Sequence, residues 1–157
     1  MYLLASLLLA LAPSQSAPPA DSLLIEVAGR VTVLHAAELA ALPRDSVRWS
    51  PEHGPSHLYA GVRLSELLRH EGVPLDSLRG PDLTRRVVVE AADRYRAVFA
   101  LAELAPGIGS RVVLLADRQD GQPLPAAAGP FRLIVPADGK GARCVRQVIA
   151  LRVRDEP

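Results

Sequence analysis

Short apolar runs dominate the chain, and most of them have the composition of strands. Arg85–Ala91 contains three successive valines, and Arg111–Ala116 is a continuous apolar run of the kind found in buried strands. Alternation and β-branched residues predict further strands at Leu23–Ala28, Val31–Leu34, Ser46–Ser50, His57–Ala60, Tyr95–Ala100, Phe131–Val135 and Cys144–Val153. The chain is therefore predicted to be built mainly from short strands.

Helical periodicity is limited to short segments. His35–Leu42 is predicted to form a helix that ends before Pro43, and the leucines between residues 64 and 68 share one face of a second helix that ends at Gly72. The remaining connections are predicted as helical turns at Leu75–Gly80 and Leu101–Leu104, a tight turn at Asp93–Arg94, and loops at Pro51–Ser56 and Gln119–Pro130. Because strands dominate without a regular strand–helix alternation, the predicted class is α+β with a mixed β-sheet and short helices.

The N-terminal segment has a different pattern. Tyr2–Ala12 is almost wholly apolar and is too short to span a bilayer, which needs about 20 apolar residues. The small residues that follow allow cleavage after Ser16. We therefore expect a signal peptide at residues 1–16, a spacer at 17–22 and one domain at 23–157, with periplasmic or secreted localisation and no transmembrane segment after signal removal.

Composition narrows the function classes. The chain has 157 residues, of which 49% are hydrophobic and 22% charged, so it has enough apolar material for one buried core. Eighteen basic and seventeen acidic side chains leave a net charge of +1, and only 4% of residues are aromatic. These values argue against a nucleic-acid partner. The single cysteine, Cys144, excludes an internal disulfide and is expected to be a buried small hydrophobe.

Histidines do not form a convincing metal motif. His53 and His57 are four residues apart, a spacing that places two ligands on one face of a helix. Gly54 and Pro55 lie between them and prevent a helix. We therefore predict no metal site here, and the sequence identifies no catalytic group.

Basic residues near glycine- and proline-containing loops suggest an anion site late in the chain. Guanidinium groups bind phosphate in a bidentate manner, and glycine allows close approach of the backbone. The candidate binding residues are His53, Gly129, Arg132, Gly139, Lys140, Gly141, Arg143 and Arg146. Residues three apart in a strand point to opposite faces, so Arg143 and Arg146 can line one pocket only if a bend intervenes. Spacing alone leaves open whether these arginines are simply solvated.

Four segments resemble motifs of one family in the right order. They are Tyr59–Leu68 (YAGVRLSELL), Glu90–Leu104 (EAADRYRAVFALAEL), Asp120–Pro136 (DGQPLPAAAGPFRLIVP) and Arg143–Val148 (RCVRQV). Together they resemble the sulfite-oxidase-like molybdopterin-binding oxidoreductase domain, over roughly Leu24 to Val153. The resemblance implies a compact α+β domain with a mixed sheet and molybdopterin as cofactor.

Two positions depart from the family pattern. The resemblance implies a metal-ligating cysteine in the loop that corresponds to Arg48–Gly54, and this loop contains none. Arg94 stands where the family usually has glycine. We therefore predict an exported domain that binds a pterin or other small anionic ligand without molybdenum redox catalysis. Two alternatives remain: a molybdenum-dependent oxidoreductase with atypical metal ligation, and a non-enzymatic module that binds a protein partner on the same fold.

Overall fold

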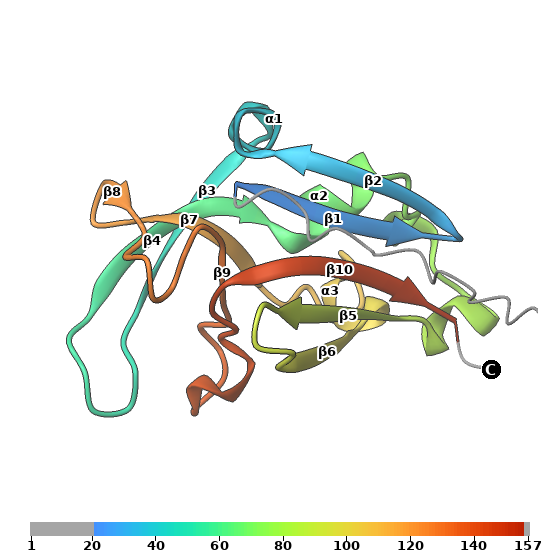
Figure 1. The fold of residues 1–157 in the computed structure, drawn as a ribbon. Coiled ribbons are helices and arrows are strands. Elements are labelled where there is room, and N and C mark those ends of the chain that lie inside the picture. Colours follow the sequence, from blue (N-terminus) through green and yellow to red (C-terminus); the bar gives the residue numbers. More distant parts are fainter. Residues whose placement is uncertain (1–20, 156–157) are drawn as a thin grey trace, which may run out of the picture.

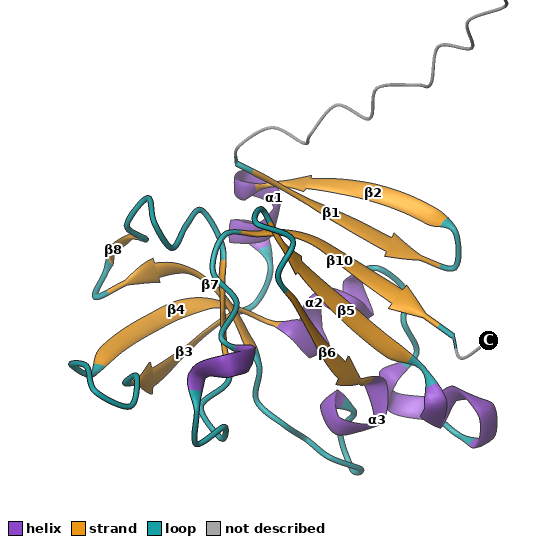
Figure 2. Ribbon diagram, turned by 60° about the horizontal axis from the view of Figure 1, so that its bottom comes forward, coloured by secondary structure: helices purple, strands orange, loops and turns teal. Residues whose placement is uncertain are grey.

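The structure is a computed structural model that describes residues 21–155, so the predicted signal peptide lies outside the described residues. Two five-stranded sheets form the framework. The first has the order β2 (Arg30–His35), β1 (Ser22–Val27), β10 (Val148–Arg154), β5 (Arg86–Ala91) and β6 (Arg96–Ala100). The second contains β3 (Arg44–Trp49), β4 (His57–Arg63), β7 (Leu114–Gln119), β8 (Gln122–Pro123) and β9 (Arg132–Ile134). Figure 2 shows the two sheets side by side.

Helices are short and serve mainly to close the core. They are α1 (Ala36–Ala41), α2 (Leu64–His70) and α3 (Leu101–Leu104), labelled in Figure 1, with 3-10 turns η1 (Leu75–Ser77), η2 (Gly80–Thr84) and η3 (Gly141–Arg143). The predicted leucine face of α2 is confirmed, because all three of its leucines are buried. Gly72 follows this helix with a φ of +85°, a conformation that glycine adopts at little cost. Within residues 21–155, no helix has the length and apolar character needed to cross a membrane.

The first sheet is mixed, as predicted. β1 and β10 pair in parallel, with Leu24 opposite Ala150, whereas the other neighbours are antiparallel. The alternation of β5 places Val87 and Val89 in the core, and Val88 points to the outer face. The α+β class is therefore confirmed, with two sheets where one was expected.

Two predicted strands begin later than their apolar pattern suggested. Arg111–Ala116 was expected to be a strand, but β7 starts at Leu114. The preceding backbone bonds elsewhere: the N–H of Arg111 donates to the carbonyl of Glu103, and the carbonyl of Val113 accepts from Leu64. The closing strand was expected from Cys144, but β10 starts at Val148, because the preceding residue Gln147 has a φ of +48° and interrupts the extended backbone.

The predicted loop Gln119–Pro130 contains an additional hairpin. β7 turns into β8 through Asp120 and Gly121, whose φ values are +50° and +80°. The Asp–Gly pair is suited to such a turn because both residues tolerate positive φ. This turn returns the chain toward β9, which pairs with the same edge of β7 as β8 does, the edge opposite β4.

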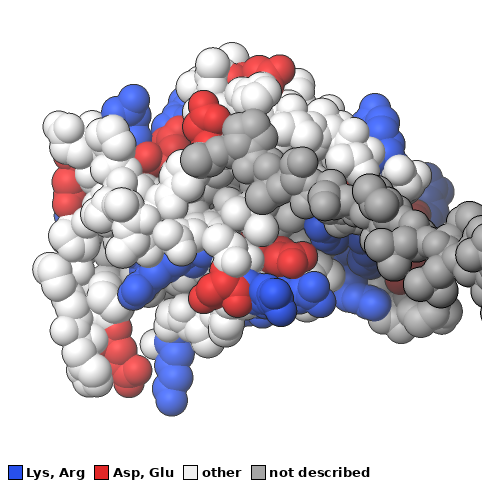
Figure 3. Space-filling view, viewed as in Figure 1, with Lys and Arg blue, Asp and Glu red and all other residues white. Residues whose placement is uncertain are grey.

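Charged side chains cover the outer face of the first sheet. Glu26 accepts hydrogen bonds from Arg154 at 2.7 and 2.8 Å and from Arg152 at 2.8 Å. Figure 3 shows acidic and basic side chains adjoining one another across the middle of this face. The hydrogen bonds from Arg154 and then Arg152 lower the pKa of Glu26 from 4.5 to about 2.

Glu26→Gln is expected to reduce the free energy of unfolding at pH 7 by about 1–2 kcal/mol, after allowance for solvent screening. Because the folded-state pKa of Glu26 is depressed to about 2, its stabilisation is complete above the ordinary value of 4.5. It is lost as the pH falls through this interval. Urea unfolding at several pH values measures both effects. If the free energy of unfolding changed equally with pH in the parent and in the variant between pH 2 and pH 4.5, the lowered pKa of Glu26 would be contradicted.

Candidate functional site

A polar hollow lies where the closing segment passes the turn between β5 and β6. Its volume is about 350 Å³, within the range of small-molecule sites. It is lined by Ala91, Asp93, Tyr95, Ala127, Gly141, Ala142, Cys144, Val145, Arg146 and Gln147. Residues from three of the four segments that carry the family resemblance therefore meet at this hollow, although they are far apart in the sequence.

Hydrogen bonds hold the walls of this hollow together. The Tyr95 hydroxyl donates to the carbonyl of Ala142 at 2.7 Å, which joins the β5–β6 turn to η3. Gln147 donates through its side chain to the carbonyl of Ala126 at 3.1 Å, joining the closing segment to the loop before β9. The turn between β5 and β6 has a φ of +71° at Arg94, so arginine adopts there a conformation that favours glycine. The site is thus built by contacts between separate loops.

A buried arginine lies behind this hollow. Arg132 is 9% exposed, and its guanidinium carbon lies 5.2 Å from the ring centroid of Trp49 and 5.4 Å from that of Tyr59. It donates from Nη1 to the Tyr59 hydroxyl at 3.2 Å, while its Nε has no partner. No carboxylate of residues 21–155 forms an ion pair with it. Two cation–π contacts stabilise this cation, but nothing among the described residues neutralises it.

Neither nearby titratable group supplies the missing negative charge. Burial raises the pKa of the Tyr59 hydroxyl, so it remains neutral at physiological pH. Burial also raises the pKa of the Cys144 thiol, although the Val135 N–H and the Arg132 charge oppose this shift. Arg132 therefore contributes a net positive potential on this side of the core.

Cys144 lies near Trp49, the last residue of β3. It lines the hollow, is 7% exposed, and its Sγ accepts a hydrogen bond from the Val135 N–H at 3.4 Å. A Cβ on Gly141 would lie 3.1 Å from Cζ2 of Trp49 and 4.0 Å from Cβ of Cys144. Only a glycine fits between the indole and the cysteine without displacement. The expected burial of the cysteine is confirmed, and its position beside the site was not expected.

Arg143 and Arg146 have different surroundings. Arg143 donates twice to Asp138 at 2.8 Å, lies within 3.3 Å of Glu103, and has its guanidinium carbon 4.6 Å from the Phe99 ring centroid. The hydrogen bond from Arg143 lowers the pKa of Asp138. Arg146 is exposed, lines the hollow, and forms no hydrogen bond or ion pair with the described residues. The two arginines therefore do not converge, because Arg143 belongs to η3 and not to a strand.

The other candidate residues are spread around the site. Lys140 and Gly139 lie in the exposed turn before η3, and His53 is exposed in the loop between β3 and β4. Gly129 lines a different hollow, on the other side of the loop that precedes β9. Part of the predicted set is therefore brought together, namely Gly141 and Arg146 in the hollow, with Arg132 behind it.

Sequence reasoning missed the two aromatic partners of Arg132 and the contribution of the β5–β6 turn. Tyr59 and Tyr95 belong to the quoted motifs, so a signal was present, but contacts between residues far apart in the sequence cannot be read from spacing. A further contact joins His57 Nδ1 to an Asp120 carboxylate oxygen at 2.6 Å. No group of three or more His, Cys, Asp or Glu side chains within residues 21–155 is arranged to hold a metal ion.

Comparison with known proteins places this geometry in a family. The model of the oxidoreductase molybdopterin binding domain matches residues 26–157. The chain belongs to this family, which confirms the resemblance and the sulfite-oxidase-like α+β fold. Molybdopterin is the cofactor that this membership implies. No curated protein sequence matches the chain.

A solved structure has the same fold. The sulfane dehydrogenase SoxCD from Paracoccus pantotrophus is similar with a TM-score of 0.68 and 22% sequence identity. The similarity covers 86% of this chain and 38% of that chain. The present chain therefore corresponds to a minor part of that protein's length.

The donor set fits one part of molybdopterin and not another. Two cations without acidic partners, Arg132 and Arg146, suit the anionic phosphate of the pterin, and the glycine at 141 leaves its backbone open to the hollow. A molybdenum centre also prefers a soft thiolate ligand. The loop Arg48–Gly54 offers none, and the Cys144 thiol is buried against the Val135 amide. The residues fit the pterin and do not fit thiolate ligation of its metal.

Proposed function

We propose that this protein binds a phosphate-bearing pterin of the molybdopterin type in the polar hollow, without thiolate ligation of a metal. Arg146, which lines the hollow, would bind the phosphate, and Lys140, exposed in the turn next to Gly141, would add a second positive charge. The hydrogen-bonded walls formed by Tyr95 and Gln147 would orient the ring system and exclude water. In the family, the bound cofactor supplies molybdenum redox chemistry; the residues of this chain account for binding and orientation.

The observation that carries this proposal is the uncompensated charge of Arg132. A buried cation without an ionic partner costs several kcal/mol, and an anion bound in the neighbouring hollow would offset part of this cost. Its Nε is shielded from solvent, so we expect Arg132 to act through its field and not by direct contact. A unit charge about 8 Å from an anion contributes about 2 kcal/mol at an effective dielectric constant of 20.

A molybdenum oxidoreductase with atypical ligation is the second candidate. The observation in its favour is that Cys144 lines the same hollow. Two features favour pterin binding alone: burial raises the pKa of this thiol, and its sulfur is already engaged by the Val135 amide. A thiolate ligand would have to give up this hydrogen bond and turn into the hollow.

We also propose that the protein is exported. The support is the apolar run Tyr2–Ala12 followed by small residues around Ser16. Sequencing the N-terminus of protein recovered from the exported fraction tests this proposal. A mature chain that begins between residues 17 and 21 is expected, and a chain that retains Tyr2–Ala12 would contradict it.

Protein purified from a host that makes molybdopterin is expected to contain pterin, measured by fluorescence after oxidative release. The double variant Lys140→Gln/Arg146→Gln should retain at least tenfold less, because it loses two charge-assisted contacts to the phosphate. Arg79→Gln is the matched control, since Arg79 is exposed and does not line the hollow. Absence of pterin from the parent protein, or equal retention by the double variant, would overturn the proposed function.

A further inference from the structure

A larger hollow lies on the opposite side of the loop that precedes β9. Its volume is about 510 Å³, and it is lined by Ala36, Ala40, Asp117, Arg118, Pro123, Leu124, Ala126, Gly129, Pro130 and Phe131. Ala126 faces this hollow, whereas the next residue, Ala127, faces the polar hollow described above. One loop therefore separates two sites, and the two can be tested independently.

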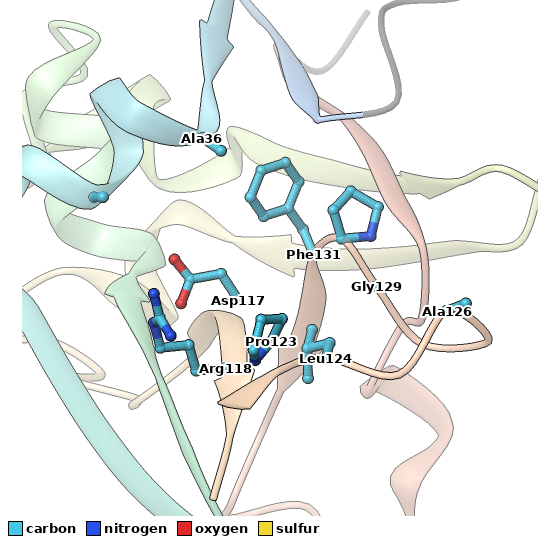
Figure 4. Close-up of a pocket in the computed structure, with 10 residues that line it drawn as sticks. Ala36, Asp117, Arg118, Pro123, Leu124, Ala126, Gly129 and Phe131 are labelled. Carbon is cyan, nitrogen blue, oxygen red and sulfur yellow. The ribbon is translucent and has the colours of Figure 1, made fainter. Parts of the chain in front are cut away.

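The walls of this larger hollow are mostly apolar. Figure 4 shows Phe131 across from Asp117 and Arg118, with Ala36 above and Pro123 and Leu124 below. Phe131 is almost fully buried and forms the base, while Ala40, one turn along α1 from Ala36, extends the apolar wall. Small side chains on α1 leave room that larger ones would fill. This shape suits an apolar molecule of moderate size.

The charged residues of the hollow determine what polar group it accepts. Asp117 is occupied by Arg44, whose guanidinium donates to both of its carboxylate oxygens. Arg118 is exposed, and its only hydrogen bond to a residue of the described chain is a long one, 3.4 Å from Nη1 to the carbonyl of Gly121. Arg44, Asp117 and Arg118 together leave one positive charge, and the unsaturated donor is Arg118. The polar end of the hollow is therefore complementary to an anion.

We infer that this hollow is a binding site for an amphiphilic organic anion, with an apolar body against Phe131 and Leu124 and one carboxylate or sulfonate on Arg118. The apolar part gains free energy by leaving water, and the guanidinium fork pairs with the acidic group. An amphiphilic cation is disfavoured because the only carboxylate in the lining is already neutralised by Arg44. The inference is independent of pterin binding.

Titration with anilinonaphthalene sulfonate, which has an apolar body and one sulfonate, tests the inference. The folded protein should bind one equivalent with a saturable rise in fluorescence. Octanoate should displace the dye, and octylammonium should not. Arg118→Gln should weaken binding about tenfold or more, because a charge-assisted hydrogen bond is lost. Ala40→Trp should abolish binding by filling the hollow.

Two variants serve as controls for the dye experiment. Ala41→Trp adds the same side chain to an exposed position of α1 outside the hollow, and Arg79→Gln removes a charge elsewhere. Both should bind the dye as the parent does, and all variants should unfold at temperatures close to the parent's. The inference is overturned if Ala40→Trp binds normally, if octylammonium displaces the dye as well as octanoate, or if no saturable binding occurs. Pterin content should be unchanged in Ala40→Trp, so failure here is distinguishable from failure of the proposed function.

Discussion

Replacing Arg132 with methionine is expected to lower pterin affinity by about 10- to 100-fold while leaving the free energy of unfolding of the ligand-free protein within about 1 kcal/mol of the parent. The variant keeps the apolar contacts with Trp49 and Tyr59 but removes a buried cation that has no acidic partner in the described chain. Losing that cation removes its attraction for the phosphate. It also removes the cost of burying an unpaired charge, which offsets the two lost cation–π contacts.

Arg143→Met provides the matched comparison for Arg132→Met. Arg143 is neutralised by Asp138 and Glu103, so its removal leaves two carboxylates without their partner. We expect Arg143→Met to lose about 1–3 kcal/mol of stability. Its pterin affinity should fall less than that of Arg132→Met. Denaturant unfolding and equilibrium binding separate the two variants. If Arg132→Met lost stability and kept its affinity, the buried cation would be structural and its assigned role would be wrong.

Gly61→Ala is expected to destabilise the protein by about 3 kcal/mol or more, and to reduce the yield of folded protein sharply. Gly61 lies in β4 at the point where its register with β7 shifts. An added Cβ would lie 2.0 Å from the carbonyl oxygen of Leu115 and 2.6 Å from the Cα of Ala116. Both neighbours are backbone atoms of the adjacent strand, so no side-chain rotation relieves the clash. The sheet would have to separate where β4 supports Tyr59.

Gly139→Ala is the control for this substitution. An added Cβ at Gly139 meets no atom within 4 Å, so the unfolding temperature should change little. Thermal unfolding monitored by circular dichroism compares the two alanine variants. A Gly61→Ala protein as stable as Gly139→Ala would show that the β4–β7 spacing is wider than described.

Local sequence patterns predicted most elements because neighbouring residues decide them. The leucine spacing of α2 and the valines of β5 were sufficient, since periodicity and burial agree there. The apolar run at Arg111–Ala116 was misleading because its first residues are held by α3 and α2 instead of a neighbouring strand. Backbone bonds of this kind join residues distant in sequence and leave no local signal.

The candidate site was only partly predictable for the same reason. Arginine identity pointed to anion binding, but Arg143 and Arg146 looked alike until Asp138 and Glu103 were seen to bind only the first. The assumption of a regular closing strand also failed, because η3 and the positive φ of Gln147 break it. Nothing in the spacing indicated that Cys144 would lie beside the glycine that contacts Trp49.

The most direct test of this account measures molybdenum and pterin per protein molecule in the parent and in Cys144→Ser, both purified from a molybdenum-replete host. A buried thiol that stays protonated and hydrogen-bonded to Val135 predicts equal pterin content in both, with molybdenum well below one equivalent in either. Stoichiometric molybdenum in the parent that disappears in Cys144→Ser would contradict it. That result would make the thiol of the closing segment a metal ligand.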